Sequence, residues 1–98
     1  MFVAACRVTL HIPSSQSLKD KRQVVRSLLQ RLRNTFAVAA AEVADQDKRQ
    51  LATLGLASVS GDAGHAEEVL DSAIRYIEET RPDIAISNTR IELLSLEA

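Results

Sequence analysis

Basic side chains are concentrated in one short segment of this 98-residue chain. Residues 17–33 hold six lysines and arginines and one acidic residue, which gives this segment a net charge of +5. Residues 62–79 hold six acidic residues and one arginine, which gives a net charge of −5. The formal net charge of the whole chain is only −1, so the total conceals two charged segments of opposite sign. The six basic residues are Lys19, Lys21, Arg22, Arg26, Arg31 and Arg33.

Most of these basic residues share one side of a predicted helix. Ser17 and Asp20 have the spacing of an N-terminal capping box, and apolar residues follow at helical intervals from Leu18 to near Asn34. With about 100° per residue, four cations fall within an arc of roughly 60° along about 21 Å of helix. Guanidinium groups match phosphate oxygens, so we expect this face to bind phosphates. The arc contains Lys19, Arg22, Arg26 and Arg33, with Lys21 and Arg31 at its margins.

Two further considerations bear on this basic face. Cations in the first turn oppose the helix dipole, which indicates a role for Lys19, Lys21 and Arg22 other than helix stability. The alternative is a solvated face that simply balances the acidic segment. Lys21 differs from the others because it falls within the apolar arc. We expect its side chain either to extend toward the edge of a sheet or to make a specific contact.

Little else in the sequence could support catalysis. His11, Ser14 and Lys21 lie near one another in the sequence, but no nucleophile motif or glycine-rich phosphate loop accompanies them. The single cysteine, Cys6, falls among apolar alternating positions and is predicted to be a buried thiol. His65 has no cysteine or second histidine nearby. We therefore expect no catalytic residue, no metal and no cofactor.

The composition favours a folded, cytoplasmic protein. Hydrophobic residues make up 46% of the chain and charged residues 26%, as in ordinary globular domains. The sequence contains neither an apolar run of membrane-spanning length nor a signal-peptide pattern. The only aromatic residues are Phe2, Phe36 and Tyr76, which disfavours binding RNA by stacking bases on a sheet.

The order of the predicted elements specifies an α+β fold in one domain spanning residues 1–98. Alternating patterns predict strands, helical periodicity predicts two helices, and a charged turn at 45–49 separates two of the strands. Apolar residues on both sides of the third strand suit a central position in the sheet. The order strand, helix, strand, strand, helix, strand is the ferredoxin-like βαββαβ plan. The expected strands are 2–12, 36–44, 50–60 and 84–96, with helices from 18 to about 34 and from 62 to the residues before Pro82.

Two helices on one side of a four-stranded sheet leave its other face open. Val3, Ala5 and about half of the second and third strands are expected on this open face, which is therefore apolar and rich in small residues. Contiguous apolar surfaces often mark interfaces, so a homodimer through the sheet face or its edges is one hypothesis. The alternative is a mildly apolar face in contact with solvent.

Several segments together resemble the YlxP-like family of small bacterial proteins of unknown function. They are Leu10-His11-Ile12-Pro13, Ser17-Leu18-Lys19-Asp20-Lys21-Arg22, Ser27-Leu28, Arg31-Leu32-Arg33, Glu42-Val43, Leu54-Gly55 and Arg90-Ile91-Glu92. The resemblance extends over essentially the whole chain. It implies a ferredoxin-like fold and a bacterial cytoplasmic protein. Genes of this family often lie beside genes for translation initiation and ribosome maturation, which implies a ribosome-related role.

The functional hypothesis is a non-enzymatic protein that binds ribosomal or other structured RNA through its basic helix. The alternative is a homodimeric protein-interaction module that docks an acidic protein surface. Affinity that falls steeply with salt is expected of the first, whereas partner binding that survives nuclease treatment is expected of the second.

Overall fold

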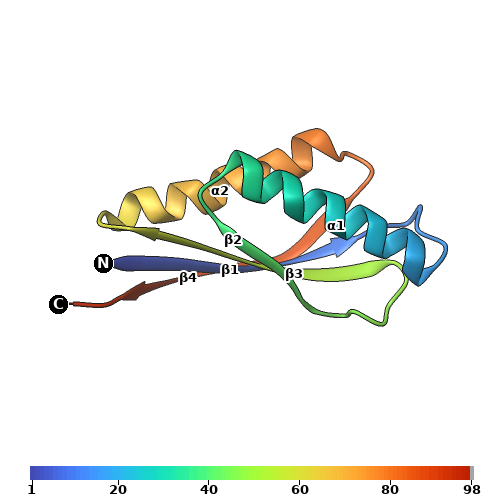
Figure 1. Cartoon of the computed structure of the whole chain (residues 1–98), viewed down its shortest axis with the longest axis horizontal. Helices are drawn as coiled ribbons and strands as arrows, with labels where there is room; N and C mark the ends of the chain where they lie inside the picture. Colours follow the sequence, from blue (N-terminus) through green and yellow to red (C-terminus); the bar gives the residue numbers. More distant parts are fainter. Residues whose placement is uncertain (98) are drawn as a thin grey trace.

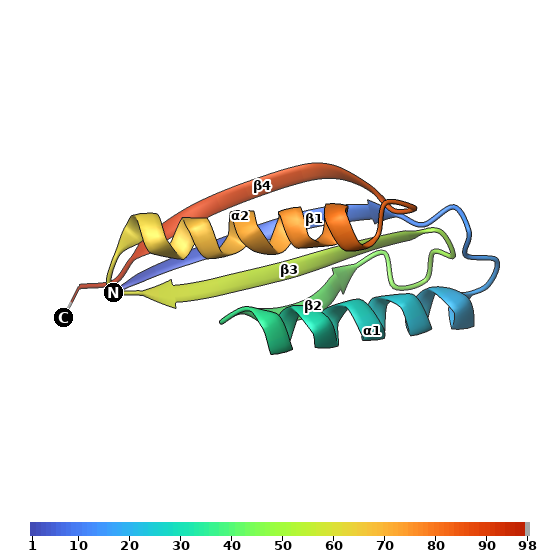
Figure 2. The same cartoon turned by 90° about the horizontal axis from the view of Figure 1, so that it is seen from above.

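The computed structural model describes residues 1–97, and it confirms the ferredoxin-like α+β arrangement (Figure 1). Both helices lie on the same side of a four-stranded antiparallel sheet, as the two views show (Figures 1 and 2). The helices within this part of the chain are too short or too polar to cross a membrane. The elements are β1 (Phe2–His11), α1 (Leu18–Thr35), β2 (Ala39–Ala44), β3 (Leu51–Ser60), α2 (Ala63–Thr80) and β4 (Ala85–Ser95).

The strand order is β2-β3-β1-β4, so β3 is a central strand as its apolar residues on both sides predict. Each strand pairs antiparallel with its neighbours. The two ends of the chain meet at one end of the sheet, where Met1 and Leu96 exchange backbone hydrogen bonds of 2.8 and 3.0 Å. The long strands β1 and β3 thus form the centre of the sheet, with β2 and β4 at its edges.

The core lies between the sheet and the helices. Alternate residues of β1 and β3 point toward the helices and are buried, among them Val8 and Leu54, which are both 0% exposed. α2 packs over β1 and β3, and α1 packs over β2 beside it (Figure 2). Phe36 and Tyr76 join the two helices through an edge-to-face contact with ring centroids 5.5 Å apart.

Side-chain caps fix where both helices begin. The Ser17 hydroxyl accepts a hydrogen bond from the backbone N–H of Asp20 at 3.0 Å, as predicted. The Asp20 carboxylate in turn accepts from the N–H of Gln16, one residue before the position that a capping box uses. The carboxylate of Asp62 caps α2 by accepting from the N–H of His65.

The boundaries of the outer strands differ from the predicted ones. β2 begins at Ala39 rather than residue 36, because Phe36 caps the end of α1 and its carbonyl is taken by the N–H of Val38. β4 begins at Ala85, because the N–H of Ile84 donates to the carbonyl of Arg81 in the turn after α2. Both outer strands also shift register against their neighbours, after Glu42 in β2 and after Arg7 of β1 in the pairing with β4.

The buried position of Leu70 gives a direct test of this core. Leu70 is 0% exposed on the inner face of α2, whereas Leu96 is 63% exposed beyond β4. We expect Leu70→Ala to lower the free energy of unfolding by about 2–5 kcal/mol, because it leaves a cavity. Leu96→Ala should change it by less than about 0.5 kcal/mol. Urea denaturation of both variants measures this difference, and equal effects would contradict the packing described.

Candidate nucleic-acid interface

Lys21 is buried and serves as an anchor within the protein. Its side chain is 0% exposed, and its ammonium group donates to the carbonyls of Asp45, Gln46 and Leu51 at 2.7, 3.2 and 3.1 Å. These carbonyls belong to the turn between β2 and β3 and to the start of β3. Of the two expectations for Lys21, the specific contact is the one observed. Its burial also corrects the expectation that Lys21 lies at the margin of an RNA-binding face.

Glu42 supplies the counter-charge for this buried lysine. Its Oε2 lies 3.1 Å from the Nζ of Lys21, and its side chain is 17% exposed. A lysine ammonium group has three N–H donors, and all three are taken by carbonyls. Oε2 of Glu42 therefore forms an ion pair but accepts no hydrogen bond from residues 1–97. The ion pair connects the first turns of α1 to the middle of β2.

Asp45 completes the turn that Lys21 holds. Its backbone has a φ of 64°, which asparagine and aspartate tolerate better than most residues. Its carboxylate accepts a hydrogen bond from the Thr53 hydroxyl at 2.7 Å and pairs with Lys48 at 3.2 Å. These contacts, chiefly the hydrogen bond from Thr53, lower the pKa of Asp45 below its usual value. The turn is thus fixed from both α1 and β3.

Three arginines of α1 converge beside this anchor. Arg22, Arg26 and Arg33 line one groove of about 270 Å³ between α1 and the outer edge of the sheet, together with Glu42. Val25 and Leu29 form its apolar floor. We refer to it as the arginine groove. Within residues 1–97, Arg22 and Arg26 form neither an ion pair nor a side-chain hydrogen bond, so their guanidinium groups are available to a ligand.

The remaining predicted residues are placed differently. Lys19 is exposed one turn before Arg22 and extends the same basic face. Arg31 is exposed but does not line the arginine groove. Arg33 lines the groove while its guanidinium group also donates to the carbonyl of Ala40 on β2, so part of its role is to hold the end of α1 against the sheet.

The other candidate residues are not brought together. His11 lies on the open face, where its Nε2 is 3.1 Å from the Ser87 hydroxyl, whereas Lys21 belongs to α1 on the other side of the sheet. Cys6 is buried as predicted, and burial raises the pKa of its thiol. In the described part of the chain no three His, Cys, Asp or Glu side chains gather in a way that could hold a metal ion.

Glu42 and Asp45 are the site residues that sequence reasoning missed. Glu42 is the one charged residue of an alanine-rich strand, and its register opposite Leu54 places it on the helix-covered side of the sheet. A lone carboxylate at an inward position and a lone lysine in an apolar arc together indicate a buried ion pair. That coincidence was available in the sequence, although only the topology brings the two residues together.

The fold and this site describe a small ferredoxin-like domain with a basic groove along one helix. A family model described as "Protein of unknown function (DUF503)" matches residues 3–91, so the chain belongs to that family. It is also similar to the uncharacterized protein YlxP of Bacillus subtilis (strain 168). The two are 36% identical over 76 residues, which is 78% of this chain and 82% of the relative. The expected resemblance to the YlxP-like family is thereby confirmed.

Removing the buried lysine should be costly for stability. We expect Lys21→Met to lower the free energy of unfolding by about 3–5 kcal/mol, because it leaves Glu42 uncompensated and three carbonyls without donors. Lys19→Met is the matched control on the exposed side of α1 and should change it by less than about 0.5 kcal/mol. Thermal and urea unfolding of the two variants test this, and a loss below about 1 kcal/mol for Lys21→Met would refute the anchoring role.

The lowered pKa of Asp45 makes part of the stability pH-dependent. A carboxyl whose pKa is lower in the folded state stabilises the protein above its unfolded-state pKa, and that contribution is lost as the pH falls through the folded-state pKa. Asp45→Asn keeps a residue suited to positive φ but cannot ionise. We expect the stability difference between wild type and this variant to be largest at neutral pH and to shrink below about pH 4. Unfolding curves from pH 7 to 2 would show it, and a constant difference would contradict it.

Proposed function

We propose that this chain is a non-enzymatic, cytoplasmic RNA-binding protein whose arginine groove holds the phosphate backbone of structured RNA. The observation that carries the proposal is the convergence of Arg22, Arg26 and Arg33 on one groove. Arginine forks bind phosphate oxygens in bidentate geometry, and arginines without protein partners keep that capacity for a ligand. Lys19 extends the cationic surface toward the start of the helix.

The surroundings of the groove support binding to a backbone rather than to bases. Two of the three aromatic residues, Phe36 and Tyr76, pack against each other and lie half-buried between the helices. They do not present rings on the open sheet face for base stacking. Contacts made through cations alone position a nucleic acid without reading its sequence. We therefore propose binding with little sequence preference and strong dependence on salt.

Ribosomal RNA is the target that we propose first. The genes of the YlxP-like family often lie beside genes of translation initiation and ribosome maturation. A densely folded RNA also offers closely spaced phosphates to a row of cations along one helix. Glu42 at the groove is already paired with Lys21, so it adds little repulsion toward a phosphate.

A salt series with purified components tests the proposal. Anisotropy of a fluorescein-labelled 20-nucleotide RNA hairpin should show an affinity that falls steeply between 50 and 200 mM salt. Arg26→Glu should weaken binding by at least about tenfold and reduce the slope of log K against log salt by about 1 or more. The matched control is Arg75→Glu, which makes the same charge reversal on the exposed side of α2 and should leave binding within about twofold.

Two results would count against this function. Equal losses for Arg26→Glu and Arg75→Glu would mean that only overall charge attracts the RNA. Retained binding by both variants would mean that the arginine groove is not the contact. If partners captured from a bacterial extract also survived nuclease treatment, an acidic protein surface would replace RNA as the ligand of the basic helix.

A further inference from the structure

The open face of the sheet is organised in rows of residues that cross the strands. Antiparallel register aligns Val59, Val3 and Leu94 in one row, and Ala39, Ala57, Ala5 and Glu92 in the next. The third row is Ala41, Gly55, Arg7 and Arg90. Small residues thus occupy the middle of the face, with larger apolar residues at the end near the chain termini and two arginines on the other side.

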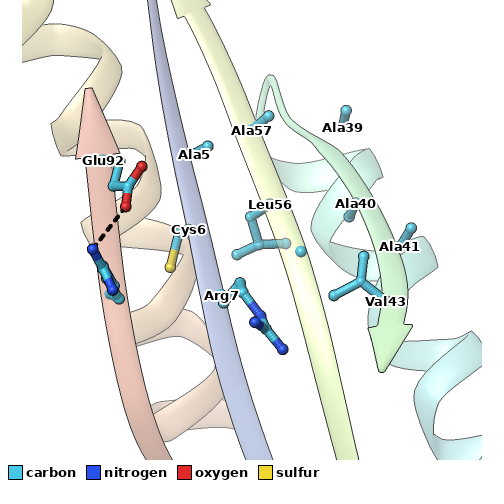
Figure 3. Close-up of a pocket in the computed structure, with 12 residues that line it drawn as sticks. Ala5, Cys6, Arg7, Ala39, Ala40, Ala41, Val43, Leu56, Ala57 and Glu92 are labelled. Atoms are coloured by element: carbon cyan, nitrogen blue, oxygen red, sulfur yellow. Dashed lines mark ion pairs between the residues drawn. The ribbon is translucent and has the colours of Figure 1, made fainter. Parts of the chain in front are cut away.

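The small residues leave a shallow hollow, which Figure 3 shows from the open side. Its volume is about 700 Å³, and its walls include Val43, Arg7 and Glu92. Gly55 lies at its base, where an added Cβ would come within 2.9 Å of the Val43 side chain. At the apolar end, Val59 is 63% exposed and Leu94 is 57% exposed.

Such a surface is unusual for a sheet that meets only water. An antiparallel sheet with one solvated face normally carries polar residues at the outward positions. Toward the chain termini, the open face instead presents alanines, valines and a leucine at its outward positions, whereas Thr9, Thr53 and His11 lie toward its other end. β1, β3 and β4 have ten or eleven residues and β2 has six. At about 3.3 Å per residue and a strand spacing of about 4.8 Å, the whole face has a projected area of roughly 600 Å². This projected area is of the same order as the ~800 Å² per partner that a standard interface buries.

The charge distribution selects a second copy of the chain as the occupant. In an isologous dimer the same patch meets itself, so a patch of one sign repels its own copy. The exposed side of α1 is basic and that of α2 is acidic. Each helix surface would therefore repel its own copy in an isologous dimer. The open face carries both signs: Arg90 and Glu92 form an exposed ion pair at 3.0 Å, with Arg7 opposite Arg90. In a dimer, the arginines of one copy can therefore pair with Glu92 of the second copy.

We propose that this chain forms a homodimer by packing the open faces of two copies against each other. Val3, Val59 and Leu94 supply the large apolar side chains of the contact, and the alanine hollow accommodates side chains of the second copy. Because the helices lie on the opposite side of the sheet (Figure 1), both arginine grooves remain exposed on the two outer surfaces of the dimer. The dimer therefore does not depend on the proposed RNA binding, and either can fail without the other.

Sedimentation equilibrium of the purified full chain tests this proposal. From 1 to 300 μM the wild type should shift toward twice its monomer mass of 10.7 kDa. The double variant Val59→Glu/Leu94→Glu should raise the dissociation constant at least about a hundredfold, because it buries carboxylates in an apolar contact. Both positions are exposed in the single chain, so the variant should remain folded by circular dichroism. Ser27→Glu, which adds a carboxylate on the exposed side of α1, is the control and should dimerise like the wild type.

A wild type that stays monomeric throughout this range would overturn the proposal. So would a Val59→Glu/Leu94→Glu variant that dimerises as the wild type does, since another surface, such as a strand edge, would then form the contact. Equal weakening by Ser27→Glu would show that net charge rather than the open face governs association.

Discussion

The position of α1 against the sheet depends on one buried ammonium group. Lys21 holds three carbonyls of the β2–β3 turn and the carboxylate of Glu42, so it connects the first turns of the helix to both strands of the outer hairpin. A lysine is rarely fully buried unless all its donors are used, because desolvation of the charge is costly. This requirement fixes the register of α1 on β2, and with it the groove into which Arg22, Arg26 and Arg33 project.

The fold separates three surfaces that differ in chemistry. The exposed side of α1 is basic, that of α2 is acidic, and the open face of the sheet is mainly apolar. Because the helices cover one face only, the basic groove and the apolar face point in opposite directions. A nearly neutral chain can therefore present a strongly cationic surface to a polyanion while a separate surface associates with protein.

The elements of the fold followed from the sequence because their signals are local. Alternation in β1, the Ser17 and Asp62 caps and the stripe of α2 each lie within a few residues of one another. The predicted start of β2 was wrong by three residues, because Phe36 caps the C-terminal end of α1 instead of beginning the strand. The site was harder to predict. The arc placed Arg22 and Arg26 on one side of the helix, as observed. For Lys21 the sequence left two expectations open and named no partner, because its partners lie 21 to 30 residues away and only tertiary contacts bring them near.

Co-sedimentation with ribosomes from a bacterial extract would show whether the arginine groove is an RNA-binding surface. The full chain would be compared with the Arg22→Glu/Arg26→Glu variant over a series of salt concentrations, with both proteins verified as folded. If the arginine groove binds RNA, the wild type should enter the ribosomal fractions at low salt and leave them as salt rises, and the variant should stay in the supernatant throughout. A variant that sediments with ribosomes as well as the wild type does would contradict it.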